Sequence, residues 1–141
     1  MFKYLHHVNY VVANLDAMIE YLDRNFGMKP ERVETSKGNH PAREAVYFAG
    51  ITEIQIVEPL DDTSSAARHL ALNGPGVTHV AWGVNDSENL FEHLVKSGNV
   101  MRRQAVSVAP RGYKTINVEP SATSLGVGFQ LIEDPDRGNC W

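Results

Sequence analysis

Leu5-His6-His7-Val8-Asn9-Tyr10-Val11-Val12 has a counterpart later in the chain, Val77-Thr78-His79-Val80-Ala81-Trp82-Gly83-Val84. In this alignment His7 falls on His79 at an offset of 72 positions, that is 79 minus 7. An aromatic residue, Tyr10 or Trp82, follows each histidine at the same distance. A repeat of this kind indicates two copies of one structural unit, so it decides the architecture before any single motif does.

A second pair of matching segments ends the two copies. Gln55 in Ile54-Gln55-Ile56-Val57-Glu58-Pro59 falls on Gln130 in Phe129-Gln130-Leu131-Ile132-Glu133-Asp134-Pro135, at an offset of 75, that is 130 minus 55. Gly74-Pro75-Gly76 lies between the copies and is typical of a chain reversal. Each half therefore begins with a strand that contains His and ends with a strand that contains Gln.

Each half is predicted to form a strand, a helix and three further strands. In the first half Asn14 is a suitable helix N-cap, and Gly27 can end the helix. Asp86 and Gly98 have the same positions around the helix of the second half. The predicted strands are 5–13, 30–35, 43–49 and 53–58, then the strand around His79 followed by 100–107, 113–118 and 127–133, and residues 64–73 form a helical connection.

This order of elements predicts an α+β fold. Two βαβββ modules, about residues 1–73 and 77–135, are expected to be related by a pseudo-twofold axis within a single domain, 1–141. Curved, mostly antiparallel sheets would form a central metal-binding groove, with the helices outside.

The repeated polar residues are candidate ligands of one divalent metal ion: His7, Gln55, His79 and Gln130. Side chains alternate along strands, so His7 and Gln55 can point to the same face, and the pseudo-twofold axis would bring their counterparts from the opposite side. Burying an unpaired amide costs on the order of 1–3 kcal/mol, so such groups in apolar strands need a common partner. Taken singly, a strand His is more often a hydrogen-bonded residue, and a strand Gln usually faces solvent.

Only one of His6 and His7 can face the ion, because adjacent residues point to opposite sides of a strand. The repeat favours His7, since the residue before His79 is Thr78. Two imidazoles and two amide oxygens suit Mn, Co, Ni, Fe or Zn in a catalytic site better than structural zinc. The histidines without a repeat partner are expected on loops or helix surfaces: His40, His69 and His93.

Composition excludes several classes of protein. With 43% apolar and 21% charged residues in 141, the chain resembles an ordinary soluble domain. A net charge of -4 gives no basic footprint, so no nucleic-acid partner is expected. The single cysteine, Cys140, cannot form an internal disulfide. No apolar stretch reaches membrane-spanning length, which predicts a cytoplasmic protein without a membrane partner.

These segments resemble the vicinal oxygen chelate superfamily of glyoxalases, bleomycin resistance proteins and dioxygenases, and most closely methylmalonyl-CoA epimerase. The resemblance covers about residues 5–135 and is most specific around Ala81-Trp82 and Pro59-Leu60. It implies a metal-dependent isomerase whose small-molecule substrate, for example a CoA thioester, loses the proton alpha to its thioester carbonyl through a metal-stabilised enolate. The position that matches the family's base is Glu44, in Arg43-Glu44-Ala45-Val46. The resemblance also implies a homodimer.

Two positions depart from the family pattern. Gln130 stands where these enzymes usually have a Glu ligand, and its amide cannot return a proton to the substrate. Asn117 stands in Asn117-Val118-Glu119-Pro120, where the family commonly has a His before the Pro.

Three other functions are therefore considered. A glyoxalase-like lyase acting on another dicarbonyl-like substrate would share the metal chemistry, but it expects an acidic ligand at Gln55 or Gln130. A non-catalytic, bleomycin-resistance-like protein would bind a small molecule, and such relatives generally lack the ligand set. A ring-cleaving dioxygenase needs two His and one carboxylate, against which Gln130 argues.

Overall fold

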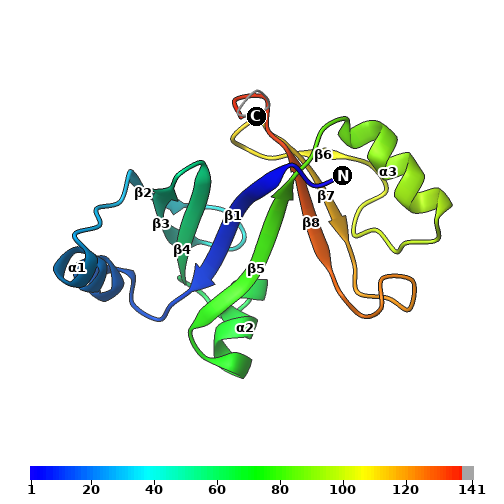
Figure 1. Cartoon of the computed structure of the whole chain (residues 1–141). Coiled ribbons are helices and arrows are strands. Elements are labelled where there is room, and N and C mark those ends of the chain that lie inside the picture. The colour runs from blue at the N-terminus through cyan, green and yellow to red at the C-terminus, as the bar shows by residue number, and fades with distance from the viewer. Residues whose placement is uncertain (138–141) are drawn as a thin grey trace. The chain divides into compact units, whose positions relative to one another are not determined.

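The computed structural model describes residues 1–137, and Cys140 lies outside the described residues. This part of the chain divides into two compact units (Figure 1). Unit 1 contains Met1–His6 and the residues from Val80 onward, and unit 2 contains His7–His79. The elements follow one another as β1 (Tyr4–Val11), α1 (Leu15–Phe26), β2 (Arg32–Ser36), β3 (Ala42–Ala49), β4 (Thr52–Pro59), α2 (Ser65–Asn73), β5 (Gly76–Gly83), α3 (Ser87–Lys96), β6 (Ser107–Val108), β7 (Lys114–Val118) and β8 (Phe129–Glu133).

The sheet of unit 2 has the strand order β2-β3-β4-β1. The β2–β3 and β3–β4 pairs are antiparallel, and β1 runs parallel to β4 with His7 opposite Glu53 and Asn9 opposite Gln55. Residues paired across neighbouring strands project to the same face of a sheet. These four polar side chains therefore share one face.

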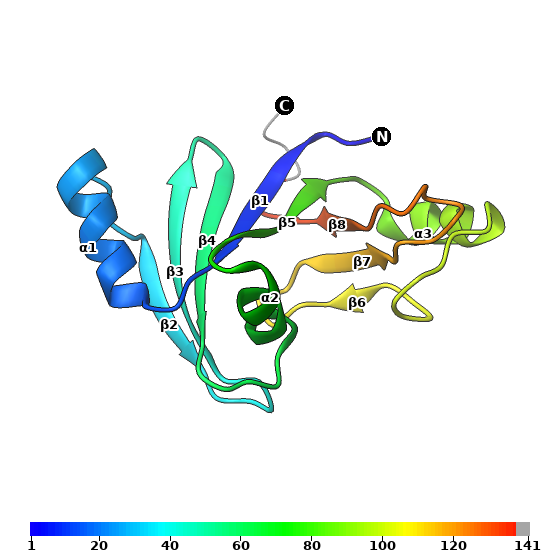
Figure 2. The same ribbon diagram turned by 90° about the horizontal axis from the view of Figure 1, so that it is seen from below.

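Helix α1 covers the other face of this sheet (Figure 2). Its start and end are those predicted, because the Asn14 side chain accepts a hydrogen bond from the backbone N–H of Ala17 and Gly27 adopts a left-handed conformation. The apolar face of the helix packs on the sheet and closes the core of unit 2, which contains Val12, Leu15, Ala45, Tyr47 and Ile56. A Val, Leu or Ile side chain in this core stabilises the fold by roughly 1.5–3 kcal/mol when fully buried.

Unit 1 repeats the arrangement of unit 2. Its strands follow the order β5-β8-β7-β6, with β5 parallel to β8 and the other neighbours antiparallel. Helix α3 starts after Asp86, as predicted, and packs on Val84, Ile116 and Leu131. The α+β class and the order of strand, helix and three strands are confirmed in both halves.

A carboxylate from the last strand of each half binds the first turn of that half's helix. Glu58 Oε2 accepts a hydrogen bond from the backbone N–H of Leu15 at 2.8 Å. Glu133 Oε2 accepts one from Ser87 at 2.9 Å. The helix residues are 72 positions apart (87 minus 15) and the carboxylates 75 apart (133 minus 58), so the repeat extends to this contact.

The strand predicted over 100–107 is mostly wrong. Met101 makes an isolated bridge to Val118, and the regular strand β6 contains Ser107 and Val108 alone. The intervening residues bend instead, because the exposed run Arg102-Arg103-Gln104 has no apolar side chain to lay on the sheet.

The helices of residues 1–137 include none that is long and apolar enough to cross a membrane.

Candidate metal centre

His7 and His79 approach each other through their ring nitrogens. β1 carries His7 and β5 carries His79, and both residues belong to unit 2. The two Nε2 atoms are 3.2 Å apart, and the rings meet edge to face with an interplanar angle of 78°. His7 is buried whereas His79 is exposed, so the pair can be reached from solvent.

This spacing fits two ligands of one ion. Imidazole nitrogens bind zinc-like ions at about 2.0–2.1 Å, so two neighbouring ligands of one ion lie roughly 3 Å apart. The Nδ1 atom of His79 lies 3.0 Å from the hydroxyl of Thr78. A hydrogen bond to the second ring nitrogen is the usual support of a metal-binding histidine. The two histidines therefore fit a metal, and the structure brings them together as the sequence predicts.

Gln55 lies on the same polar face and is buried. Its Oε1 accepts a hydrogen bond from Asn9 Nδ2 at 3.2 Å, and its Nε2 donates to Glu53 Oε2 at 2.8 Å. An amide oxygen has two lone pairs, so one remains for an ion. Gln55 as a metal ligand stays a prediction.

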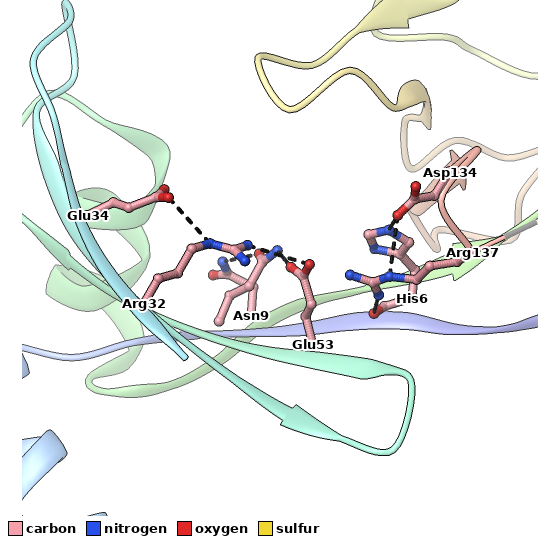
Figure 3. A network of polar contacts seen from close by, with 8 residues as sticks. His6, Asn9, Arg32, Glu34, Glu53, Asp134 and Arg137 are labelled. Carbon is pink, nitrogen blue, oxygen red and sulfur yellow. Dashed lines mark hydrogen bonds and ion pairs between the residues drawn. The ribbon is translucent and has the colours of Figure 1, made fainter. Parts of the chain in front are cut away.

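A buried carboxylate and an arginine extend this polar face toward the edge of the sheet. Arg32 lies between Glu34 and Glu53 (Figure 3), with distances of 3.4 Å from its Nε to Glu34 and 3.6 Å from its Nη2 to Glu53. Glu53 is only 4% exposed. The free-energy cost of burying its charge is offset by Arg32 and by the hydrogen bond from Gln55.

Glu44, the predicted base, is half-buried on β3, opposite Val57 and Glu34. It lines a hollow of about 260 Å³ together with these two residues. The preceding residue, Arg43, turns to the other face, where it donates to Asp16 on α1 at 3.0 and 2.8 Å. That hydrogen bond is the main reason why the pKa of Asp16 lies below its ordinary value.

Gln130, the fourth predicted ligand, lies on β8 in unit 1. It pairs with Ala81 on β5 and with Asn117 on β7, and its side chain is half-buried. Its participation in the same metal site stays a prediction.

His6 belongs to a separate polar network in unit 1. Its Nε2 lies 3.0 Å from Asp134 Oδ2, and its carbonyl oxygen accepts a hydrogen bond from Arg137 at 3.2 Å (Figure 3). The ring is fully buried and meets Tyr113 edge to face. These contacts give His6 a structural role, which agrees with His7 as the candidate ligand.

Three residues around the histidine pair are not among the residues predicted from the sequence: Asn9, Glu53 and Thr78. A signal for two of them was present, because Asn9 stands two positions from His7, and Glu53 stands two positions from Gln55, on the same side of each strand. Within residues 1–137 no three His, Cys, Asp or Glu side chains gather closely enough to hold an ion. A metal site on this face therefore needs amide ligands in addition to the histidines.

The chain is similar to methylmalonyl-CoA epimerases of known structure. The enzyme from Mycobacterium tuberculosis is 27% identical with a TM-score of 0.80, and the alignment covers 96% of this chain and 91% of that chain. A second methylmalonyl-CoA epimerase is 25% identical with a TM-score of 0.77, over 96% and 97% of the two chains. The Streptomyces coelicolor enzyme, solved in complex with 2-nitronate-propionyl-CoA, has a TM-score of 0.77 at 18% identity over 96% and 99%, which shows a shared fold.

Family membership rests on the sequence itself. The comparison with curated proteins gave no match. The family described as the Glyoxalase/Bleomycin resistance protein/Dioxygenase superfamily matches residues 6–116, which is well over half of the chain. The chain therefore belongs to the Glyoxalase/Bleomycin resistance protein/Dioxygenase superfamily.

Proposed function

We propose that this protein is a metal-dependent isomerase of the methylmalonyl-CoA epimerase type, which removes the proton alpha to a thioester carbonyl. The observation that carries the proposal is the 3.2 Å approach of His7 Nε2 to His79 Nε2. It occurs in a chain that is 27% and 25% identical to two methylmalonyl-CoA epimerases of the same fold. The proposed substrate is a CoA thioester with a second carbonyl or carboxylate group.

One divalent metal ion is part of the proposal, with Co, Mn, Ni, Zn and Fe as candidates. Its proposed ligands are His7, Gln55, His79 and Gln130. When bound, the ion supplies a positive charge that polarises the substrate's carbonyl oxygen and so makes the neighbouring C–H more acidic. None of the four side chains carries a negative charge, so the ligand set does not weaken this polarisation.

Glu44 is the proposed base, and its carboxylate would take the proton from the substrate carbon. A positioned carboxylate typically contributes about 10²–10⁴-fold to the rate of such a transfer. Register places Glu44 on the face of β3 that also presents Val46, and Val46 is paired with Gln55. Base and candidate ligand thus share one face of the unit 2 sheet. Gln130 has no ionisable proton to return, so loss of the proton and inversion of the carbon should be measured separately.

The first test is the metal content of the purified protein compared with a His79→Ala variant. We expect about one divalent ion per chain in the wild type and its loss in the variant. The control is His93→Ala, because His93 lies on α3 in unit 1 and is not one of the proposed ligands. Absence of metal after incubation with Mn, Co, Ni or Zn would contradict the proposal and favour a non-catalytic binding protein.

The second test is deuterium uptake from solvent into methylmalonyl-CoA. We expect uptake that requires both metal and Glu44. Binding of metal without uptake into any acidic thioester would exclude the isomerase, and turnover of a dicarbonyl adduct would then indicate a glyoxalase-like lyase.

The proposal includes a homodimer, as the family resemblance implies, and a location in the cytoplasm. Light scattering of the purified protein would measure the mass of the assembly, and a monomer would contradict this part.

A further inference from the structure

We infer that Glu53 fixes the proton of the neutral His79 ring on Nδ1. It acts through the intervening side chains of Gln55, Asn9 and Thr78. Glu53 is thus a positioning residue of the candidate metal centre. The inference rests on the proposed function in one respect: that the lone pair left on His79 Nε2 binds the metal ion.

The chain of hydrogen bonds from Glu53 to His79 is called the relay below. It starts at the carboxylate of Glu53, which can only accept hydrogen bonds. Glu53 Oε2 lies 2.8 Å from Gln55 Nε2, so the NH2 group of this amide must face Glu53. The carbonyl side of Gln55 then faces Asn9, whose Nδ2 donates to Gln55 Oε1 at 3.2 Å. Glu53 thereby determines the orientation of both amides.

The relay continues through a hydroxyl group. Asn9 Oδ1 lies 2.7 Å from Thr78 Oγ1, and an amide oxygen only accepts, so the hydroxyl hydrogen points toward Asn9. A second, longer contact of this hydroxyl, 3.3 Å, is to the backbone oxygen of the same residue. Its single hydrogen is therefore committed to Asn9.

The last link determines the tautomer of His79. Thr78 Oγ1 lies 3.0 Å from His79 Nδ1 and can only accept there, because its hydrogen is already used. Nδ1 must then carry the proton. A neutral imidazole has one ring proton, so Nε2 keeps its lone pair. This lone pair is on the atom that lies 3.2 Å from His7 Nε2.

The same hydrogen bonds with every donor and acceptor exchanged would be unfavourable because of Glu53. Reversal would turn the Gln55 carbonyl oxygen toward the carboxylate at 2.8 Å, which places two acceptors in contact. Water has little access to relieve that contact, since Gln55 is 5% exposed and Asn9 9% exposed. Arg32 lies beside Glu53, as Figure 3 shows, and balances its charge.

The test is the tautomer of His79 in the metal-free protein, measured from the nitrogen NMR shifts of labelled histidine rings at alkaline pH. The His79 signals are those that disappear in His79→Ala. We expect the wild type to carry the proton on Nδ1. In Glu53→Gln the amide can donate or accept, so the tautomer ratio should shift toward Nε2–H by about fivefold, the scale of one net hydrogen bond. Glu34→Gln is the matched control, because it removes the other carboxylate beside Arg32 but lies outside the relay.

A second pair of variants keeps the test valid if Glu53→Gln does not fold. Thr78→Val removes the acceptor for His79 Nδ1 and should cause the same shift, whereas Thr78→Ser keeps the hydroxyl and should retain the wild-type ratio. A wild-type proton on Nε2, or an unchanged ratio in Glu53→Gln or in Thr78→Val, would overturn the inference.

Metal titration then separates this inference from the proposed function. If the lone pair serves an ion, Glu53→Gln should weaken metal binding by about 10–100-fold, the usual effect of losing a partner behind a ligand. A wild type that binds no metal would overturn the proposed function, while the tautomer measurement would still decide the relay. Metal binding that is equal in the two proteins would overturn the role of Glu53 as a positioning residue and leave the proposed function intact.

Discussion

Glu133 accepts two hydrogen bonds from Ser87, one from its backbone N–H at 2.9 Å and one from its hydroxyl at 2.5 Å. The contact joins the last strand of unit 1 to the first turn of α3, where negative charge is favourable. The hydroxyl bond is the main reason why the pKa of Glu133 lies below its ordinary value of 4.5, and the backbone N–H and Lys114 act in the same direction.

This contact predicts a loss of stability in acid. A carboxyl whose pKa is lower in the folded state contributes stability above its unfolded pKa and loses it as the pH falls through the folded pKa. We expect Glu133→Gln to lower the free energy of unfolding by about 1–3 kcal/mol at neutral pH, and by progressively less below pH 4.5. Denaturant unfolding over a pH series measures this difference, with the exposed Glu92→Gln on α3 as control. A difference that did not change with pH would contradict the assignment.

Gly83 is predicted to tolerate no side chain. A Cβ atom at this position would lie 2.1 Å from Cε1 of the Tyr4 ring, so the whole rigid ring would have to move. We expect Gly83→Ala to destabilise the protein by about 1–3 kcal/mol, as overpacking typically does. Thermal unfolding compared with Gly38→Ala is the measurement, because a Cβ at Gly38 meets nothing within 4 Å. Equal melting temperatures would show that β1 can move away from β5 here.

Substitution of the proposed base should separate catalysis from metal binding. We expect Glu44→Gln to lower the rate of deuterium uptake into methylmalonyl-CoA by about 10²–10⁴-fold, because the amide cannot take a proton. Metal content should stay at the wild-type level. The control is Glu31→Gln, an exposed carboxylate that precedes β2. Undiminished uptake in Glu44→Gln would assign the role of base to another residue.

Restoring the family's usual acidic residue should strengthen metal binding. We expect Gln130→Glu to raise the affinity on the order of tenfold, since a full negative charge replaces an amide dipole beside a cation. Calorimetric titration with Mn or Co measures the change, with the exposed Gln104→Glu as control. An unchanged affinity would show that Gln130 does not reach the ion bound by His7 and His79.

The repeat in the sequence was sufficient to predict the order of the elements. Matching positions in the two halves have the same local role, so the sequence alone identifies the N-caps Asn14 and Asp86. The strand predicted over 100–107 is the exception, because the exposed polar run that begins at Arg102 has no apolar side chain to pack on the sheet. One N–H, that of Arg102, bonds to Asn117, and the chain then leaves the strand.

The sequence by itself determined which two histidines belong together, because a 72-residue offset singles out His7 and His79 whatever the details of folding. Only the tertiary structure decided how their nitrogens meet and what orients them. Glu53 and Asn9 carry no repeat signal, and their roles come from the parallel register of β1 and β4, which places them opposite His7 and Gln55. Register depends on how two strands pair, and the paired residues His7 and Glu53 lie 46 positions apart in the sequence (53 minus 7). It is set by the packing of α1 on one face of the sheet, because a slip of one residue would move every polar side chain into the core.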